Sequence, residues 1–148
     1  MRAPPRIPLV IRALVVVVAA SVVVASCGGA SQEAPSGSQV VVELSDYKVT
    51  VNVASVKAGS VKIGVRNVAN MEHSFQVIKT DLAPDKLPVD GVTAKAKEDG
   101  KVGEIPSIPA GKSAAVTIAF TPGNYVFICN VSGHYQLGMH TGFTVEAP

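Results

Sequence analysis

The chain has 148 residues, which is enough for one ordinary domain and too few for two. Thirteen Lys and Arg residues nearly balance eleven Asp and Glu residues, and three of these bases lie in residues 1–26, which contain no acid. Residues 27–148 therefore carry a formal charge of −1, and we expect no nucleic-acid partner. Two cysteines exclude a disulfide-dense scaffold, and the CxxC, GxGxxG and Walker patterns of common redox and nucleotide-binding enzymes are missing from the sequence.

The first 26 residues have the pattern of an export signal. A basic segment ends at Arg12, and an apolar run of mainly valine and alanine follows over 13–25. This run is shorter than the roughly 20 residues that a membrane-spanning helix needs, which is typical of a secretory signal peptide.

The segment Val24-Ala25-Ser26-Cys27 resembles the lipobox of bacterial lipoproteins, in which the cysteine is lipidated and becomes the new N-terminus. The resemblance implies a signal peptide over 1–26, lipidation of Cys27, and an extracytoplasmic protein anchored to the cell membrane. The alternative is an ordinary signal peptide or an uncleaved anchor, with Cys27 present by chance.

The rest of the chain divides into a tether and one domain. Residues 27–39 are small and polar and are predicted to be a flexible tether. From Val40 on, apolar and polar residues alternate with a period of two, which is typical of strands. Turn residues separate seven such segments, over 40–43, 48–53, 61–65, 74–79, 114–120, 125–131 and 142–145.

Seven or eight short strands without a long amphipathic helix predict an all-β fold, a Greek-key β-sandwich, over residues 40–148. Residues 80–104 interrupt the pattern, because they are polar and contain several prolines and glycines. We expect them to form a surface excursion with one helical turn.

The chemistry of the domain is concentrated in a Cys-x4-His-x4-Met motif, formed by Cys129, His134 and Met139. A further histidine, His73, lies at the start of an earlier predicted strand. One thiolate, two imidazoles and a thioether suit copper that alternates between Cu(I) and Cu(II), and a His₂Cys plane with a weak axial Met is the arrangement of blue-copper sites. The residues therefore predict one type 1 copper ion.

Other interpretations of these residues are open. Structural zinc also uses Cys and His, but a thioether is a poor zinc ligand. A Cys–His nucleophile would need a substrate cleft, and the sequence contains no further sign of one. His140 follows Met139 directly, so on an extended chain it points to the opposite face and away from the metal. With a different register His140, and not Met139, would reach the metal.

The segment YVFICNVSGHYQLGMHTGF, residues 125–143, resembles the cupredoxins, and most of all the rusticyanin and sulfocyanin branch. That branch shares the Y-x-F-x-C strand, the G-H and G-M pairs, and an H-S-F segment that matches residues 73–75. The resemblance implies four copper ligands and a serine, Ser74, that hydrogen-bonds toward the cysteine loop. The implied ligands are His73, Cys129, His134 and Met139. The chain departs from the branch at Ser132, where proline is common, and in the long excursion at 80–104.

The resemblance implies a membrane-tethered one-electron carrier and not an enzyme. Its partners would be redox proteins, such as a cytochrome or an oxidase-type donor or acceptor, and the carrier itself would be a monomer. We expect His134 to be the ligand nearest to the surface, with Tyr135, Leu137, Gly138 and Met71 on the rim around it.

The alternative function is an extracytoplasmic lipoprotein that carries or buffers copper. Transport sites usually contain many methionines or a cysteine pair, whereas only Met71 and Met139 follow the predicted signal peptide. A fragment of a copper oxidase or a nitrite reductase would need a second, histidine-rich copper centre, which three histidines cannot supply.

Overall fold

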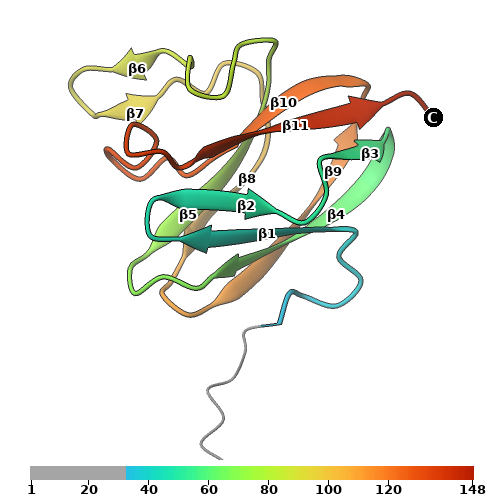
Figure 1. Ribbon diagram of the computed structural model, residues 1–148, viewed down its shortest axis with the longest axis horizontal. Helices are drawn as coiled ribbons and strands as arrows, with labels where there is room; N and C mark the ends of the chain where they lie inside the picture. The colour runs from blue at the N-terminus through green and yellow to red at the C-terminus, as the bar shows by residue number, and fades with distance from the viewer. Residues whose placement is uncertain (1–32) are drawn as a thin grey trace, which may run out of the picture.

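Strands form where the sequence alternates between apolar and polar residues. The computed structural model describes residues 33–148, and within them it contains eleven strands and no helix, so the predicted all-β sandwich is confirmed (Figure 1). In chain order the strands are β1 (Val40–Ser45), β2 (Lys48–Val51), β3 (Ser55–Lys57), β4 (Gly59–Asn67), β5 (His73–Lys79), β6 (Val89–Asp90), β7 (Lys95–Ala96), β8 (Lys101–Ile108), β9 (Ser113–Phe120), β10 (Gly123–Ile128) and β11 (His140–Glu146).

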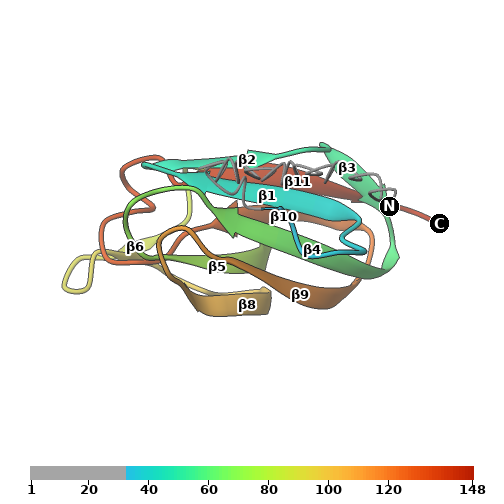
Figure 2. The same cartoon turned by 90° about the horizontal axis from the view of Figure 1, so that it is seen from below.

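Nine of these strands form two sheets that pack face to face. One sheet has the order β2-β1-β4-β9, and the other has the order β3-β11-β10-β5-β8. Figure 2 shows the two layers from the side. The remaining strands, β6 and β7, form a small hairpin of their own. Most neighbours are antiparallel, while β1 with β4 and β3 with β11 are parallel.

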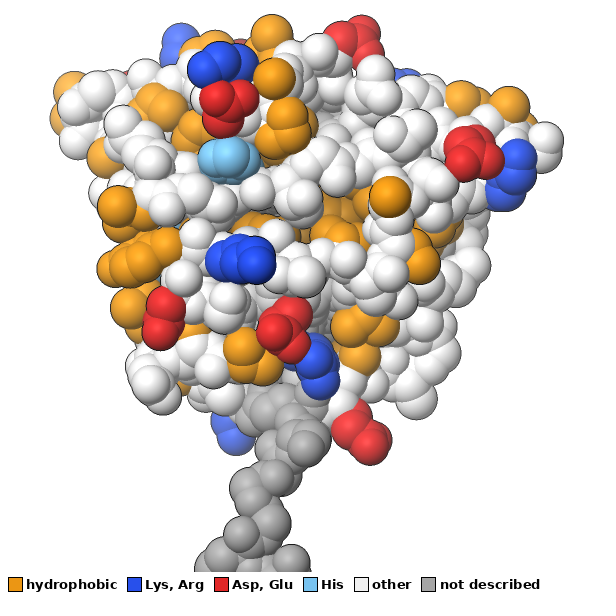
Figure 3. Space-filling model, viewed as in Figure 1, with side chains coloured by type: hydrophobic (Ala, Val, Ile, Leu, Met, Phe, Trp, Pro, Cys, Tyr) orange, Lys and Arg blue, Asp and Glu red, His pale blue; other side chains and the backbone are white. Residues whose placement is uncertain are grey.

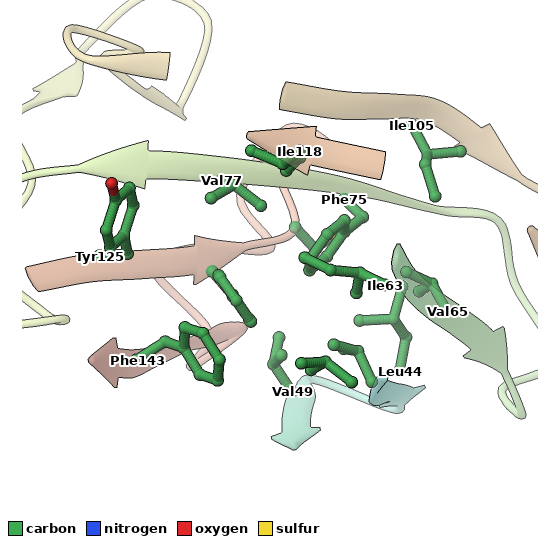
Figure 4. Packing of buried hydrophobic residues seen from close by; sticks show 14 of the residues in the cluster. Leu44, Val49, Ile63, Val65, Phe75, Val77, Ile105, Ile118, Tyr125 and Phe143 are labelled. Atoms are coloured by element: carbon green, nitrogen blue, oxygen red, sulfur yellow. The ribbon is translucent and has the colours of Figure 1, made fainter. Parts of the chain in front are cut away.

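The core lies between the two sheets. Inward-facing residues of both layers are almost fully buried, among them Leu44 and Ile63 from the first sheet and Phe75 from the second (Figure 4). Phe127 packs edge-on against Phe75, with 5.3 Å between ring centroids, and stacks on Phe143 at 4.6 Å. These contacts join β5, β10 and β11, the strands that border the predicted metal site.

The excursion differs from its prediction in two ways. It contains the β6–β7 hairpin, which the sequence pattern did not predict, and the single expected turn lies within this hairpin, where the Ala94 N–H donates to the Asp90 carbonyl at 2.9 Å. It also ends at Gly100, since β8 begins at Lys101. The sequence of β8 is poor in apolar residues and contains Pro106, which is tolerated because β8 lies at the edge of its sheet.

The excursion covers the outer face of β5 and β10. Residues on this face, including Ile78, Val126 and Ile128, form a second apolar cluster with Leu87 and Ala96 of the excursion. Strands with a period of two usually leave one face in water, but β5 and β10 are buried on both faces. The continuous apolar run of β10, residues 125–128, is typical of a strand that is buried on both faces, whereas β5 also buries the polar side chains of Ser74 and Gln76.

The last residues of the predicted tether lie against β4. Gln39 donates a backbone hydrogen bond to the carbonyl of Lys62 at 2.9 Å, and the Lys62 ammonium donates to the carbonyl of Ser36 at 2.8 Å. Ser38 and Pro35 lie directly over Gly64, where a Cβ atom would collide with the serine side chain. The predicted signal peptide and Cys27 fall outside the described residues.

Within residues 33–148, no helix is long and apolar enough to cross a membrane. Charged side chains are scattered among apolar and neutral polar ones on the face that Figure 3 shows. They form no continuous basic area on this face.

A glycine in β8 provides a test of the sheet packing. A Cβ atom on Gly103 would lie 2.6 Å from Cδ1 of Ile118 in β9, so Gly103→Ala should lower the free energy of unfolding by about 1–3 kcal/mol through overpacking. Gly91→Ala is the control, because a Cβ atom there meets nothing within 4 Å. Urea unfolding monitored by circular dichroism measures both. Adding Ile118→Val should recover part of the loss, and equal effects of the two glycine changes would contradict this packing.

Candidate metal centre

Strand pairing brings the first two predicted ligands together. β5 begins at His73, and Cys129 directly follows the end of β10. β5 and β10 are antiparallel neighbours, with Gln76 opposite Ile128. The start of one strand and the end of the other therefore meet at the same end of the sheet.

The third predicted ligand, His134, reaches the same end of the sheet because it lies in a closed loop. Residues 129–139, here called the ligand loop, connect β10 to β11, whose first residue His140 pairs with Ile128. The backbone N–H of Cys129 donates to the carbonyl of Met139 at 3.0 Å, which closes the loop. Gly133 and Gly138 have φ values of 80° and 112°, and these left-handed conformations allow the chain to turn on either side of His134.

The three side chains converge on one point. The Nδ1 atoms of His73 and His134 are 3.2 Å apart, and the Sγ atom of Cys129 lies 3.6 Å from the first and 3.5 Å from the second. An ion at the centre of such a triangle would lie about 2 Å from each donor atom, the usual length of a bond from a transition metal to an imidazole nitrogen. The residues present therefore fit a single metal ion.

Burial sets the protonation of the two histidines. His73 is fully buried and His134 is half-buried. Burial lowers the pKa of His73, the nearby His134 lowers it further, and the carboxylate of Asp46 opposes this shift. Burial also lowers the pKa of His134. Both rings are thus kept neutral near pH 7, which is the form that binds a metal.

The fourth predicted ligand, Met139, lies in the same region of the core. Its side chain is fully buried in the cluster that also contains Cys129. Its backbone N–H donates to the carbonyl of His134 at 3.1 Å. The neighbouring His140 lies outside the group of three donor atoms, and its ring is 5.2 Å from that of Tyr135.

Hydrogen bonds surround the sulfur atom. The backbone N–H of Ser74 donates to the Sγ atom of Cys129 at 3.3 Å, and the Ser74 hydroxyl lies 3.7 Å from the same sulfur. The hydroxyl also accepts the backbone N–H of Asn130 at 3.0 Å. Ser74 therefore joins β5 to the ligand loop, and donors beside a ligating sulfur shift the electron density that it offers to a metal.

The surroundings of His134 differ from the predicted rim. Tyr135 is buried and not at the surface, while Leu137 is 58% exposed and Met71 is half-buried. A further residue beside His134, which was not predicted, is Tyr47; it lies in the turn between β1 and β2 and is 40% exposed. Its ring meets His134 edge-on, with 5.5 Å between centroids. No local pattern around Tyr47 indicates this contact.

A buried asparagine fixes the segment that leads to His73. The Nδ2 atom of Asn67 donates to the carbonyls of Met71 at 2.7 Å and Ile108 at 2.8 Å, and Oδ1 accepts the backbone N–H of Ala69 at 3.0 Å. The side chain thus has all its hydrogen bonds within the fold. It joins the end of β4 to the edge strand β8 just before the first predicted ligand.

Known proteins resemble this chain in structure and not detectably in sequence. Neither a scan of protein-family models nor a search of curated proteins gives a match. Among solved structures, an auracyanin from the photosynthetic bacterium Roseiflexus castenholzii has a TM-score of 0.53 at 20% sequence identity, over 72% of this chain and 94% of the auracyanin. Auracyanin B has a TM-score of 0.54 at 20% identity, over 72% of this chain and 86% of its own.

Rusticyanin from Thiobacillus ferrooxidans is similar to the same degree. Its TM-score is 0.55 at 18% identity, over 72% of this chain and 76% of the rusticyanin, which is a copper protein. At such low identity the likeness establishes the fold alone. The domain has the cupredoxin fold, in the form that the auracyanins and rusticyanin share.

Proposed function

We propose that the protein is a one-electron carrier that holds one type 1 copper ion. The observation that carries the proposal is the close approach of two imidazole nitrogens and one cysteine sulfur, 3.2–3.6 Å apart, from His73, His134 and Cys129. Two imidazole nitrogens and a cysteine sulfur, together with the thioether of Met139, would be the donor set of a blue-copper ion. When bound, the copper accepts and releases a single electron.

The support around these residues favours electron transfer. His73 and Cys129 are fully buried at the ends of paired strands, so strand pairing and core packing hold their positions. Fixed ligands need little rearrangement when the charge of the ion changes. His134 is nearer to the surface, beside the exposed Leu137 and Tyr47, and these side chains give a redox partner an apolar contact close to the metal.

The alternative function, copper carriage or buffering, is less well supported. A protein that passes copper on must expose ligands to its partner, whereas two of the three converging side chains have no solvent exposure. The redox partners of the proposed carrier are a donor and an acceptor protein of the cytochrome or oxidase type. We propose that the carrier acts as a monomer.

The proposal includes a lipid anchor at Cys27 that holds the domain outside the cytoplasm. The motif Val24-Ala25-Ser26-Cys27 supports it. The predicted tether, residues 27–39, would join this anchor to the domain, and its last residues, 35–39, contact β4. A tether of this length would keep the domain close to the membrane and its electron-transfer partners.

Replacement of the cysteine tests the copper site. Cys129→Ser should abolish the intense visible absorption of the copper-loaded, oxidised domain, because that band arises from charge transfer between thiolate and copper. The sandwich should still fold, since its core does not depend on the metal. Absorption and circular dichroism spectra measure the two effects. A variant that remains blue would show that Cys129 is not a ligand.

The axial ligand has its own test. Met139→Leu should retain copper and raise the reduction potential by about 60 mV or more, a tenfold change in the one-electron equilibrium. Loss of the thioether removes a donor that stabilises Cu(II) more than Cu(I), while leucine still excludes water. His140→Ala is the control and should leave the potential unchanged. If voltammetry shows the reverse pattern, Met139 is only a core residue.

Lipidation is tested on the full chain. Cys27→Ser should release the protein from the membrane or leave the signal peptide uncleaved, because two or more acyl chains on one residue anchor a protein stably and none remain in the variant. Fractionation of cells together with intact-mass analysis measures this. A mature wild-type chain that begins at any residue other than Cys27 would contradict the proposed anchor.

A further inference from the structure

The excursion reaches the metal-binding end of the domain as well as the outer face of the sheet. Figure 1 shows the β6–β7 hairpin beside the loop that enters β11, and Figure 2 shows the same proximity from below. This loop is the ligand loop, residues 129–139, which carries His134. The contacts between the two segments are specific hydrogen bonds and not only apolar packing.

On one side of His134, three residues of the ligand loop are tied to the hairpin. The hydroxyl of Ser132 donates to the carbonyl of Thr93 at 2.7 Å, and the N–H of Gly133 donates to the carbonyl of Ala94 at 2.8 Å. Asn130 binds most extensively, because its Oδ1 accepts the N–H of Ala96 at 2.8 Å. Its Nδ2 donates to the Ala96 carbonyl at 2.9 Å and to Glu98 Oε1 at 2.8 Å.

On the other side of His134, Tyr135 anchors the loop to the start of the excursion. Its hydroxyl donates to the carbonyl of Pro84 and accepts the N–H of Leu87, each at 2.8 Å. Its ring is buried in the apolar cluster that contains Leu87 and Ala96. Both neighbours of His134, Gly133 and Tyr135, are therefore hydrogen-bonded to the excursion.

Asn130 is also linked to the sulfur of Cys129 by two successive hydrogen bonds. Its backbone N–H donates to the hydroxyl of Ser74, whose own N–H donates to the Sγ atom of Cys129. The strand ladder of β10 ends at Ile128, so Asn130 is not held by strand pairing. Its side chain is buried with both amide hydrogens and the oxygen satisfied, and loss of such a buried network is costly.

One backbone feature indicates that the hairpin is shaped for this contact. Ala94 adopts a left-handed conformation with φ of 54°, which is unusual for a residue with a Cβ atom. The carbonyl of this residue is the one that accepts the N–H of Gly133. The uncommon conformation thus occurs at a point of contact with the ligand loop.

From these contacts we propose that the segment 84–98 positions the ligand loop, mainly through its hydrogen bonds with Asn130, which is the principal positioning residue of that loop. The segment holds the residues on either side of His134, Gly133 and Tyr135, and through Asn130 and Ser74 it holds the hydrogen bonds on Cys129. It thereby sets the reduction potential of the metal and slows its loss. The statements about potential and metal retention rest on the proposed function, whereas the statement about the loop does not.

The test compares two asparagines of the same strand region. Asn130→Ala should release the ligand loop, and Asn124→Ala is the control. Asn124 lies at the opposite end of β10 and binds the same excursion through Asp81 at 3.0 Å. In the copper-loaded domain, we expect Asn130→Ala to speed the transfer of copper to a chelator at least tenfold and to shift the reduction potential. We expect Asn124→Ala to match the wild type in both measurements.

The same pair is compared without metal. Hydrogen exchange of the Gly133 amide should be at least tenfold faster in Asn130→Ala than in Asn124→Ala, because this N–H loses its held partner when the loop detaches. This measurement is independent of copper. If the wild-type domain failed to bind copper, the proposed function would fail, while unchanged amide exchange would overturn the positioning role itself.

A second pair of variants distinguishes the positioning role from simple misfolding of Asn130→Ala. Asn130→Asp places a carboxylate against Glu98, so it should weaken the contact and speed copper loss. Adding Glu98→Gln supplies an amide that can donate to this carboxylate, and it should restore slow copper loss and the potential in part. If the double change gives no recovery, or if Asn130→Ala lowers thermal stability without moving the potential or the rate of copper loss, the positioning role is wrong.

Discussion

The antiparallel pairing of β5 with β10 is the constraint on which the rest of the site depends. It places His73, the first residue of one strand, beside Cys129, the residue after the other strand. The hydrogen bond from Cys129 to Met139 then closes the ligand loop and lets β11 continue the sheet. A stable sheet thus fixes two donor atoms, and only the loop with His134 has to be held by other means.

The excursion has two physical roles. Its apolar residues cover Val126 and Ile128, which would otherwise expose an apolar surface to water. Its backbone and Glu98 supply the hydrogen-bond partners that the ligand loop lacks within the sheet. Burial of the outer face and stiffness of the site therefore come from the same segment, so a change in its packing is felt at the metal-binding end.

The solvent exposure of the site residues increases from the core to the surface. Cys129 and His73 are fully buried, and the sulfur accepts a backbone hydrogen bond from Ser74. His134 is half-buried and meets Tyr47 and an exposed apolar residue, Leu137. Such a gradient keeps water from the donor atoms and leaves one imidazole near the surface. This arrangement suits the proposed exchange of single electrons with a partner protein.

The sequence by itself determined the all-β class and the three donor residues of the ligand loop, because both follow from local patterns: alternation with period two, and a cysteine, a histidine and a methionine at short spacing. The approach of His73, which is 56 residues from Cys129, depends on the pairing of β5 with β10. Only the tertiary structure decided how the ligand loop is held. Asn130 and Ala96 are 34 residues apart, and Tyr47 is still farther from His134. The sequence pattern also did not predict the edge strand β8 or the burial of the outer face of β10. Contacts of this kind depend on which surfaces meet after folding, and no local pattern records that.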